Sequence, residues 1–232
     1  MGKDLIIACD FPDKKTCLDF LSHFKEQKPF VKIGMELYYA EGPEIIRELK
    51  NRNHKVFLDL KLHDIPNTVE KAMAVLAKFG VDMCNLHAGG GIAMMEAALR
   101  GLCQGDGPRP KLIAVTQLTS TSQGVLESEL LIEKPMDAVV REYAANAKKA
   151  GLDGVVCSPL EAGSVKEVCG PAFLTVTPGI RFPHGESGDQ VRITTPAKAR
   201  DLGSDYIVVG RPITAAADPV SAYLRCVEEF TK

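Results

Sequence analysis

The chain has 232 residues, which is close to the usual size of one (β/α)8 barrel. Its 28 basic and 30 acidic residues give a formal net charge of −2, and no basic run favours a nucleic acid or an anionic membrane surface as a partner. The longest apolar stretches have only the length of a strand, so we expect no transmembrane span. A predicted strand begins directly after Asp4, which leaves no room for a signal peptide.

The cysteines and histidines show no metal-binding pattern. Seven cysteines form no Cys-x-x-Cys pair, and the five histidines are scattered along the chain. An odd number of cysteines without ligand spacing is typical of reduced thiols that pack as small hydrophobic residues. We therefore expect a cytoplasmic protein, and we expect neither a metal nor a cofactor.

Short apolar runs, each rich in β-branched residues, alternate with segments of helical spacing along the whole chain. The runs cover residues 5–10, 30–34, 55–61, 83–87, 112–118, 154–158, 173–177 and 206–210. No linker, low-complexity tract or composition break interrupts the alternation. We predict an α/β fold, a single (β/α)8 TIM barrel that forms one catalytic domain over residues 1–232. A doubly wound open sheet is the structural alternative, and eight even repeats make it less favoured.

Two local patterns predict where helices begin. Asn67 and Glu70 have the spacing of a capping box. Thr195 followed by Pro196 is typical of an N-cap residue followed by proline at the first helical position.

The third run carries charges that a buried strand rarely holds. Asp59 and Lys61 are two residues apart, so their side chains should project from the same face of the strand, and Asp64 follows shortly after. Charges at such a place usually have a use. The structural alternative is a surface ion pair at a fraying strand end, which would contribute little.

Other polar residues lie at the predicted carboxyl ends of the strands, where barrel enzymes carry their chemistry. They are Asp10, Lys32, His87, Gln117, Thr119, Arg181, Gly210 and Arg211. This concentration of polar groups at one rim favours a functional site more strongly than any single residue does.

The last two strands predict a phosphate site. Barrels often bind phosphate with the loops after strands seven and eight, and these loops contain Gly179, Arg181, Gly210 and Arg211. Glycine lets backbone N–H groups approach an anion, and arginine can bind it through two hydrogen bonds. A turn glycine beside a solvated arginine is the common alternative.

Two connections are long for a compact domain, residues 119–135 and 178–193. Loops of this length are usually functional or disordered. We interpret residues 178–193 as a mobile lid over a bound ligand.

Six sequence blocks closely resemble the bacterial type of the orotidine 5′-monophosphate decarboxylase family. The blocks are Ile6–Asp10, Phe30–Glu36, Phe57–Val69, Ala114–Ser120, Leu174–Arg181 and Val208–Arg211. The Asp-x-Lys-x-x-Asp pattern alone is shared by related phosphate-binding barrels, whereas all the blocks in this order are highly specific.

The resemblance implies roles for the charged residues. Lys61 would donate a proton to C6 of the pyrimidine, and Asp59 would flank it and face the departing carboxyl group. Asp64 and Thr68 would reach into the active site of the other subunit of a homodimer. Asp10 and Lys32 would hold the ribose hydroxyls and join the same network of charges.

The resemblance also implies which residues would contact the base and the phosphate of the nucleotide. Thr119 would lie near the base, and the phosphate would be held by Arg181, Gln190, Gly210 and Arg211. The implied reaction is the cofactor-independent conversion of orotidine 5′-monophosphate to uridine 5′-monophosphate and CO2, the last step of de novo pyrimidine synthesis.

Two other functions remain open from the sequence. The first is a metal-dependent sugar-phosphate decarboxylase or aldolase of the same barrel group, which would lose activity in a chelator. The second is a catalytically silent barrel that only binds a nucleotide. Opposed charges in a strand argue against the second, since binding alone does not need them.

Overall fold

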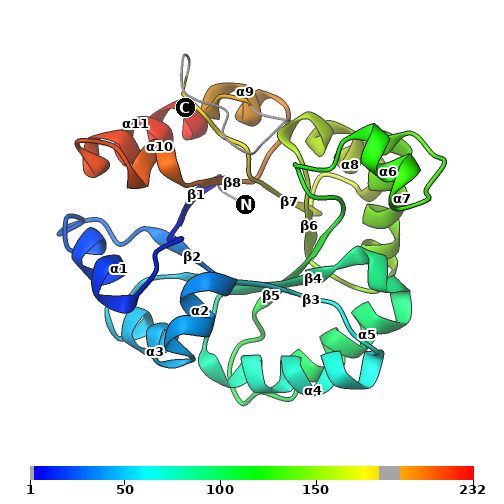
Figure 1. Ribbon diagram of the computed structural model, residues 1–232, viewed down its shortest axis with the longest axis horizontal. Helices are drawn as coiled ribbons and strands as arrows, with labels where there is room; N and C mark the ends of the chain where they lie inside the picture. The colour runs from blue at the N-terminus through cyan, green and yellow to red at the C-terminus, as the bar shows by residue number, and fades with distance from the viewer. Residues whose placement is uncertain (1–2, 183–193) are drawn as a thin grey trace.

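In the computed structural model, eight parallel strands close into a barrel (Figure 1). The structure describes residues 3–182 and 194–232. The strands are β1 (Asp4–Ala8), β2 (Phe30–Gly34), β3 (Val56–Leu62), β4 (Met83–His87), β5 (Lys111–Val115), β6 (Gly154–Val156), β7 (Leu174–Thr177) and β8 (Tyr206–Val209). Ile6 of β1 is in register with Val208 of β8, and this pairing closes the ring. The predicted TIM barrel is confirmed, and every predicted run overlaps one strand.

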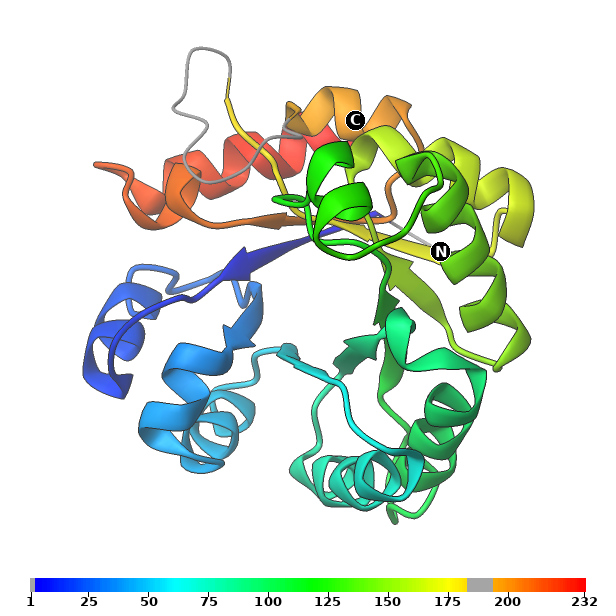
Figure 2. The ribbon, with the colours of Figure 1, turned by 45° about the vertical axis from the view of Figure 1, so that its right-hand side comes forward.

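Helices surround the strands, as Figures 1 and 2 show from two sides. They are α1 (Lys14–Leu21), α2 (Met35–Glu41), α3 (Glu44–Asn51), α4 (Pro66–Leu76), α5 (Gly91–Leu102), α6 (Gln123–Ser128), α7 (Met136–Lys149), α8 (Ala162–Cys169), α9 (Pro196–Asp201), α10 (Arg211–Thr214) and α11 (Pro219–Thr231). Among the described residues, no helix is long and apolar enough to cross a bilayer.

The strands are buried on both faces, which explains their continuous apolar runs. One cluster fills the barrel interior and includes Phe57 of β3 and Met83 of β4. The larger cluster lies between strands and helices and includes Leu58, the neighbour of Phe57. Because side chains alternate along a strand, Asp59 has the same inward direction as Phe57. The charged side chain of Asp59 therefore points toward the axis of the barrel.

The two predicted helix starts have different outcomes. The Thr195 hydroxyl accepts a hydrogen bond from the Lys198 N–H at 3.3 Å, so the predicted cap of α9 is confirmed. The predicted capping box at Asn67 is wrong, because α4 already begins at Pro66 and the Ile65 side chain before it makes no cap. Proline suits the first helical position, since it has no N–H to leave unpaired there.

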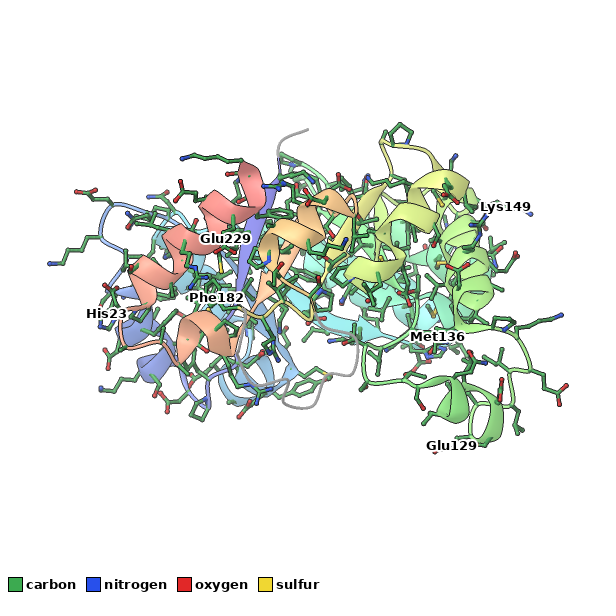
Figure 3. All side chains as sticks on the ribbon, turned by 90° about the horizontal axis from the view of Figure 1, so that it is seen from above. His23, Glu129, Met136, Lys149, Phe182 and Glu229 are labelled. Carbon is green, nitrogen blue, oxygen red and sulfur yellow. The ribbon has the colours of Figure 1, made fainter. Side chains whose placement is uncertain are left out.

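Residues 119–135 are not a structureless loop, because they contain α6. The Gln123 side chain accepts from the Met136 N–H at 2.8 Å and donates to the Lys134 carbonyl at 3.0 Å. These bonds tie the start of α6 to the start of α7. Figure 3 shows the segment between Glu129 and Met136 projecting from the body of the barrel.

The seven cysteines all lie in the described part of the chain and form no disulfide there, and all except Cys103 are buried, as expected for small hydrophobic side chains. Burial raises the pKa of Cys84 and that of Cys226 to about 12. These two thiols are therefore protonated at neutral pH.

Candidate active site

A cavity of about 860 Å³ opens at the carboxyl ends of the strands. Its volume lies in the range that holds a nucleotide-sized ligand. The floor is apolar and contains Ala8, Phe57, Val115, Val156 and Val208. The polar part of the wall contains Asp10, Lys32, Asp59, Lys61, Gln117, Thr119, Ser120, Arg181, Gly210 and Arg211. The structure thus gathers most of the residues that the sequence singled out.

Four side chains from β2, β3 and the end of β1 form a row of alternating charge. Lys32 Nζ lies 2.8 Å from Asp10 Oδ1 and 3.3 Å from Asp59 Oδ2. Lys61 Nζ lies 2.7 Å from the other oxygen of Asp59. Lys32 and Asp59 are only 8% and 7% exposed. The predicted neighbourhood of Asp59 and Lys61 is present, and it is part of a larger network.

Each buried charge in this row is stabilised by its neighbours. Burial acts to lower the pKa of Lys32, but the carboxylates of Asp59 and Asp10 outweigh it and raise that pKa above its usual value. Burial acts to raise the pKa of Asp59, but Lys32, Lys61 and the hydrogen bonds to Asp59 hold that pKa below its usual value. Both groups therefore carry their charges at neutral pH.

The backbone at Lys61 is unusual for a strand. Its φ is 51°, in the left-handed region that residues with a Cβ rarely adopt, and the pairing of β3 with β4 shifts register between Leu58 and Leu62. The Lys61 N–H donates to Asn85 Oδ1 at 2.8 Å, and Asn85 Nδ2 donates to Asp59 Oδ1 at 2.7 Å. Sequence reasoning missed Asn85, although an asparagine inside the apolar run of β4 was a usable signal.

Sequence reasoning also missed Gly34 as a residue that shapes the site. A Cβ added there would lie 3.0 Å from Asp10 Oδ1 and 3.2 Å from Lys32 Nζ. Gly34 is in register with Asp59 on the neighbouring strand, so its missing side chain leaves room for the ion pair of Asp10 and Lys32.

The described residues that are predicted to bind phosphate lie in the part of the cavity wall that follows β7 and β8. Arg181 is buried, and its guanidinium donates to the Ile180 carbonyl at 2.8 Å. The Arg181 N–H donates to the Thr194 carbonyl and the Thr194 N–H to the Gly179 carbonyl, both at 2.9 Å. These bonds join the two flanks of residues 183–193. Gln190 and most of the predicted lid lie outside the described residues.

Two predicted site residues do not reach the cavity of their own chain. Asp64 and Thr68 are both exposed, and neither contributes to the cavity wall. The Asp64 carboxylate accepts from the Ile65 N–H at 2.6 Å. Thr119, in contrast, is buried in the wall after β5. Across residues 3–182 and 194–232, no group of three or more His, Cys, Asp or Glu side chains has an arrangement that could hold a metal ion.

Known proteins resemble the chain over nearly its whole length. The model of the orotidine 5′-phosphate decarboxylase / HUMPS family matches residues 3–226. Over 226 residues the chain is 58% identical to the orotidine 5′-phosphate decarboxylase of Bacillus cytotoxicus and 57% identical to that of Bacillus anthracis, and each alignment covers 96% of this chain and 95% of the relative.

Two solved structures have the same fold. The orotidine 5′-phosphate decarboxylase of Lactobacillus acidophilus superposes with a TM-score of 0.89 at 43% identity over 100% of both chains. An uncharacterized conserved protein of Geobacillus kaustophilus superposes with a TM-score of 0.88 at 52% identity, covering 97% of this chain and 99% of its own. The chain belongs to the orotidine 5′-phosphate decarboxylase / HUMPS family.

Proposed function

We propose that this protein is an enzyme that decarboxylates orotidine 5′-monophosphate to uridine 5′-monophosphate and CO2, the last step of de novo pyrimidine synthesis. The observation that carries the proposal is the Lys61 ammonium held 2.7 Å from the buried carboxylate of Asp59 in the wall of a nucleotide-sized cavity. The identity to decarboxylases of two Bacillus species supports the choice of substrate.

The chemistry explains why fixed charges are needed. Loss of CO2 from C6 of the pyrimidine leaves a carbanion with no adjacent group to delocalise it. A preorganised cation at C6 stabilises the negative charge as it develops. In our proposal Lys61 is that cation, and it then transfers a proton from Nζ to C6.

Asp59 acts on the ground state in this proposal. Two like charges about 4 Å apart repel by roughly 4 kcal/mol at an effective dielectric constant near 20. A substrate carboxylate bound beside Asp59 would meet this repulsion and lose it as CO2 departs. The repulsion lowers the barrier only if contacts elsewhere hold the substrate in place.

Those contacts would come from the other walls of the cavity. We propose that Arg181, Gly210 and Arg211 bind the phosphate, because they follow β7 and β8, where barrels commonly bind it. Gln190 is assigned to the same group by family resemblance. Asp10 would bind the ribose hydroxyls.

Lys32 would share the ribose contacts, and its ion pairs with Asp10 and Asp59 would couple the ribose to the reacting end. Thr119, which is buried in the wall after β5, would lie near the base.

We further propose a cytoplasmic homodimer with shared active sites. Asp64 and Thr68 are exposed and lie outside the cavity of their own chain, which supports a role toward a second subunit. In this arrangement Asp64 would add a second carboxylate beside Lys61 of the partner's site.

The test is the ultraviolet absorbance of orotidine 5′-monophosphate mixed with purified protein in excess chelator. We expect conversion to uridine 5′-monophosphate at the same rate with and without the chelator. A folded protein that binds uridine 5′-monophosphate without releasing CO2 would instead be a nucleotide-binding barrel. Activity on sugar phosphates that requires a divalent metal would support the other enzyme class.

A further inference from the structure

We propose that Asn85 is a positioning residue for the decarboxylation, because its amide holds both the Asp59 carboxylate and the backbone of Lys61. This inference rests on the proposed function. Asn85 is 1% exposed in the middle of β4 and does not contribute to the cavity wall that the structure describes. It therefore acts through its two partners and not by touching the substrate.

The two hydrogen bonds fix the orientation of the amide. Asn85 Oδ1 accepts from the Lys61 N–H at 2.8 Å, and Asn85 Nδ2 donates to Asp59 Oδ1 at 2.7 Å. The opposite orientation would place an NH2 group against an N–H donor and a carbonyl oxygen against a carboxylate. A side-chain amide carries an acceptor oxygen and a donor nitrogen on the same carbon, which matches these two partners.

The first bond supports the conformation of Lys61. The register of β3 against β4 shifts between Leu58 and Leu62, so regular strand pairing does not extend through Lys61. Its backbone has a φ of 51°, which is strained for a residue with a Cβ and persists only where the surroundings impose it. Asn85 gives the Lys61 N–H a buried partner in this conformation, from which Nζ returns to within 2.7 Å of Asp59.

The second hydrogen bond fixes the Asp59 carboxylate, with which the Lys61 ammonium forms its ion pair. Asp59 Oδ1 accepts from both Asn85 Nδ2 and Lys61 Nζ at 2.7 Å, while Lys32 Nζ lies 3.3 Å from Oδ2. With Asn85 in place, the carboxylate cannot rotate without breaking a buried hydrogen bond. One amide thus sets the relative position of the two groups on which the proposed chemistry depends.

The sharpest test replaces Asn85 by its closest isostere. Asn85→Asp keeps an acceptor for the Lys61 N–H but places a carboxylate opposite Asp59. Two carboxylates at this distance share a proton when one is available, and the protonated member can then donate to the other. We expect kcat to fall about 100-fold relative to the wild type at pH 8, as for a small misplacement of reacting groups.

The pH profile separates positioning from a merely structural role. Because the carboxyl pair takes up a proton as pH falls, the ratio of variant to wild-type kcat should rise toward one at lower pH. The affinity for uridine 5′-monophosphate should stay within about threefold of the wild-type value, since Asn85 does not face the ligand. Asn53→Asp is the matched control for the change of amide to carboxylate, because Asn53 is exposed and lies outside the cavity wall. Its pH profile should follow the wild type.

Each remaining outcome has one interpretation. Wild-type kcat in Asn85→Asp at every pH would overturn the inference. A loss of kcat that is constant with pH and accompanied by an equal loss of nucleotide affinity would assign Asn85 a structural role only. If the wild-type protein itself does not convert orotidine 5′-monophosphate, the proposed function fails and the inference fails with it. An active wild type beside an unaffected variant overturns the inference alone.

Discussion

Replacing Lys32 by methionine removes the charge that links the two carboxylates of the row but keeps most of the apolar stem. Lys32 Nζ lies 3.3 Å from Asp59 Oδ2, a separation at which the attraction is about 5 kcal/mol at an effective dielectric constant near 20. The cost of burying both ions offsets part of this attraction, and breaking a buried pair typically destabilises a protein by about 3–5 kcal/mol. We expect a loss near the lower end, because Asp59 keeps its contacts with Lys61 and Asn85.

The loss should depend on pH in a defined direction. The folded-state pKa of Asp59 is lowered, so its ionisation contributes stability above the unfolded pKa, and this contribution is lost as pH falls through the folded pKa. Without Lys32, the effect of burial on that pKa is opposed by fewer charges, and folded Asp59 takes up its proton at a higher pH. The variant therefore regains stability relative to the wild type as pH falls from 7 toward about 4.

Urea unfolding at one fixed protein concentration, at pH 7 and at about pH 4, measures the loss of stability and its dependence on pH. Lys15→Met is the control, because Lys15 forms an ion pair with Asp19 on the surface, and it should leave the urea midpoint unchanged. A Lys32→Met variant as stable as the wild type at pH 7 would refute the reasoning. A loss of equal size at both pH values would refute the assigned cause.

Three further predictions concern the site. Arg211→Ala should weaken binding of uridine 5′-monophosphate roughly 10- to 100-fold in calorimetry and leave uridine binding unchanged, whereas equal losses would remove Arg211 from the phosphate site. Gly34→Ala should lower kcat, because the added Cβ would crowd Lys32, and normal turnover would contradict that packing. The control is Gly107→Ala, because a Cβ at Gly107 meets nothing within 4 Å. Mixed inactive variants Asp64→Ala and Lys61→Ala should recover about one quarter of wild-type activity, since half the dimers would hold one intact site of two. No recovery after demonstrated subunit exchange would exclude a shared site.

The strands were predictable because parallel strands buried on both faces leave continuous apolar runs. Local signals were less uniform. Thr195 caps α9 as predicted. Asn67 does not cap α4, because the helix already begins at Pro66, and proline is suited to the first helical position. Helix α6 was missed because it is short and is tied down by bonds from Gln123 to residues beyond the helix.

The site was predictable where it follows strand alternation and not where it depends on neighbouring strands. Alternation placed Asp59 beside Lys61, and the ion pair is present. It did not reveal the left-handed backbone of Lys61 or the amide of Asn85, because both depend on the register shift between β3 and β4. The space kept free by Gly34 likewise appears only when β2 is placed beside its neighbours.

The central claim is that Lys61 performs the chemistry in a cavity that other residues use for binding. The most direct measurement is a single-turnover experiment with the wild type or Lys61→Ala in saturating excess over orotidine 5′-monophosphate, with uridine 5′-monophosphate affinity measured on the same samples. We predict that the wild type converts the substrate and that Lys61→Ala binds the product but releases almost no CO2. Conversion by Lys61→Ala at the wild-type rate would contradict the account.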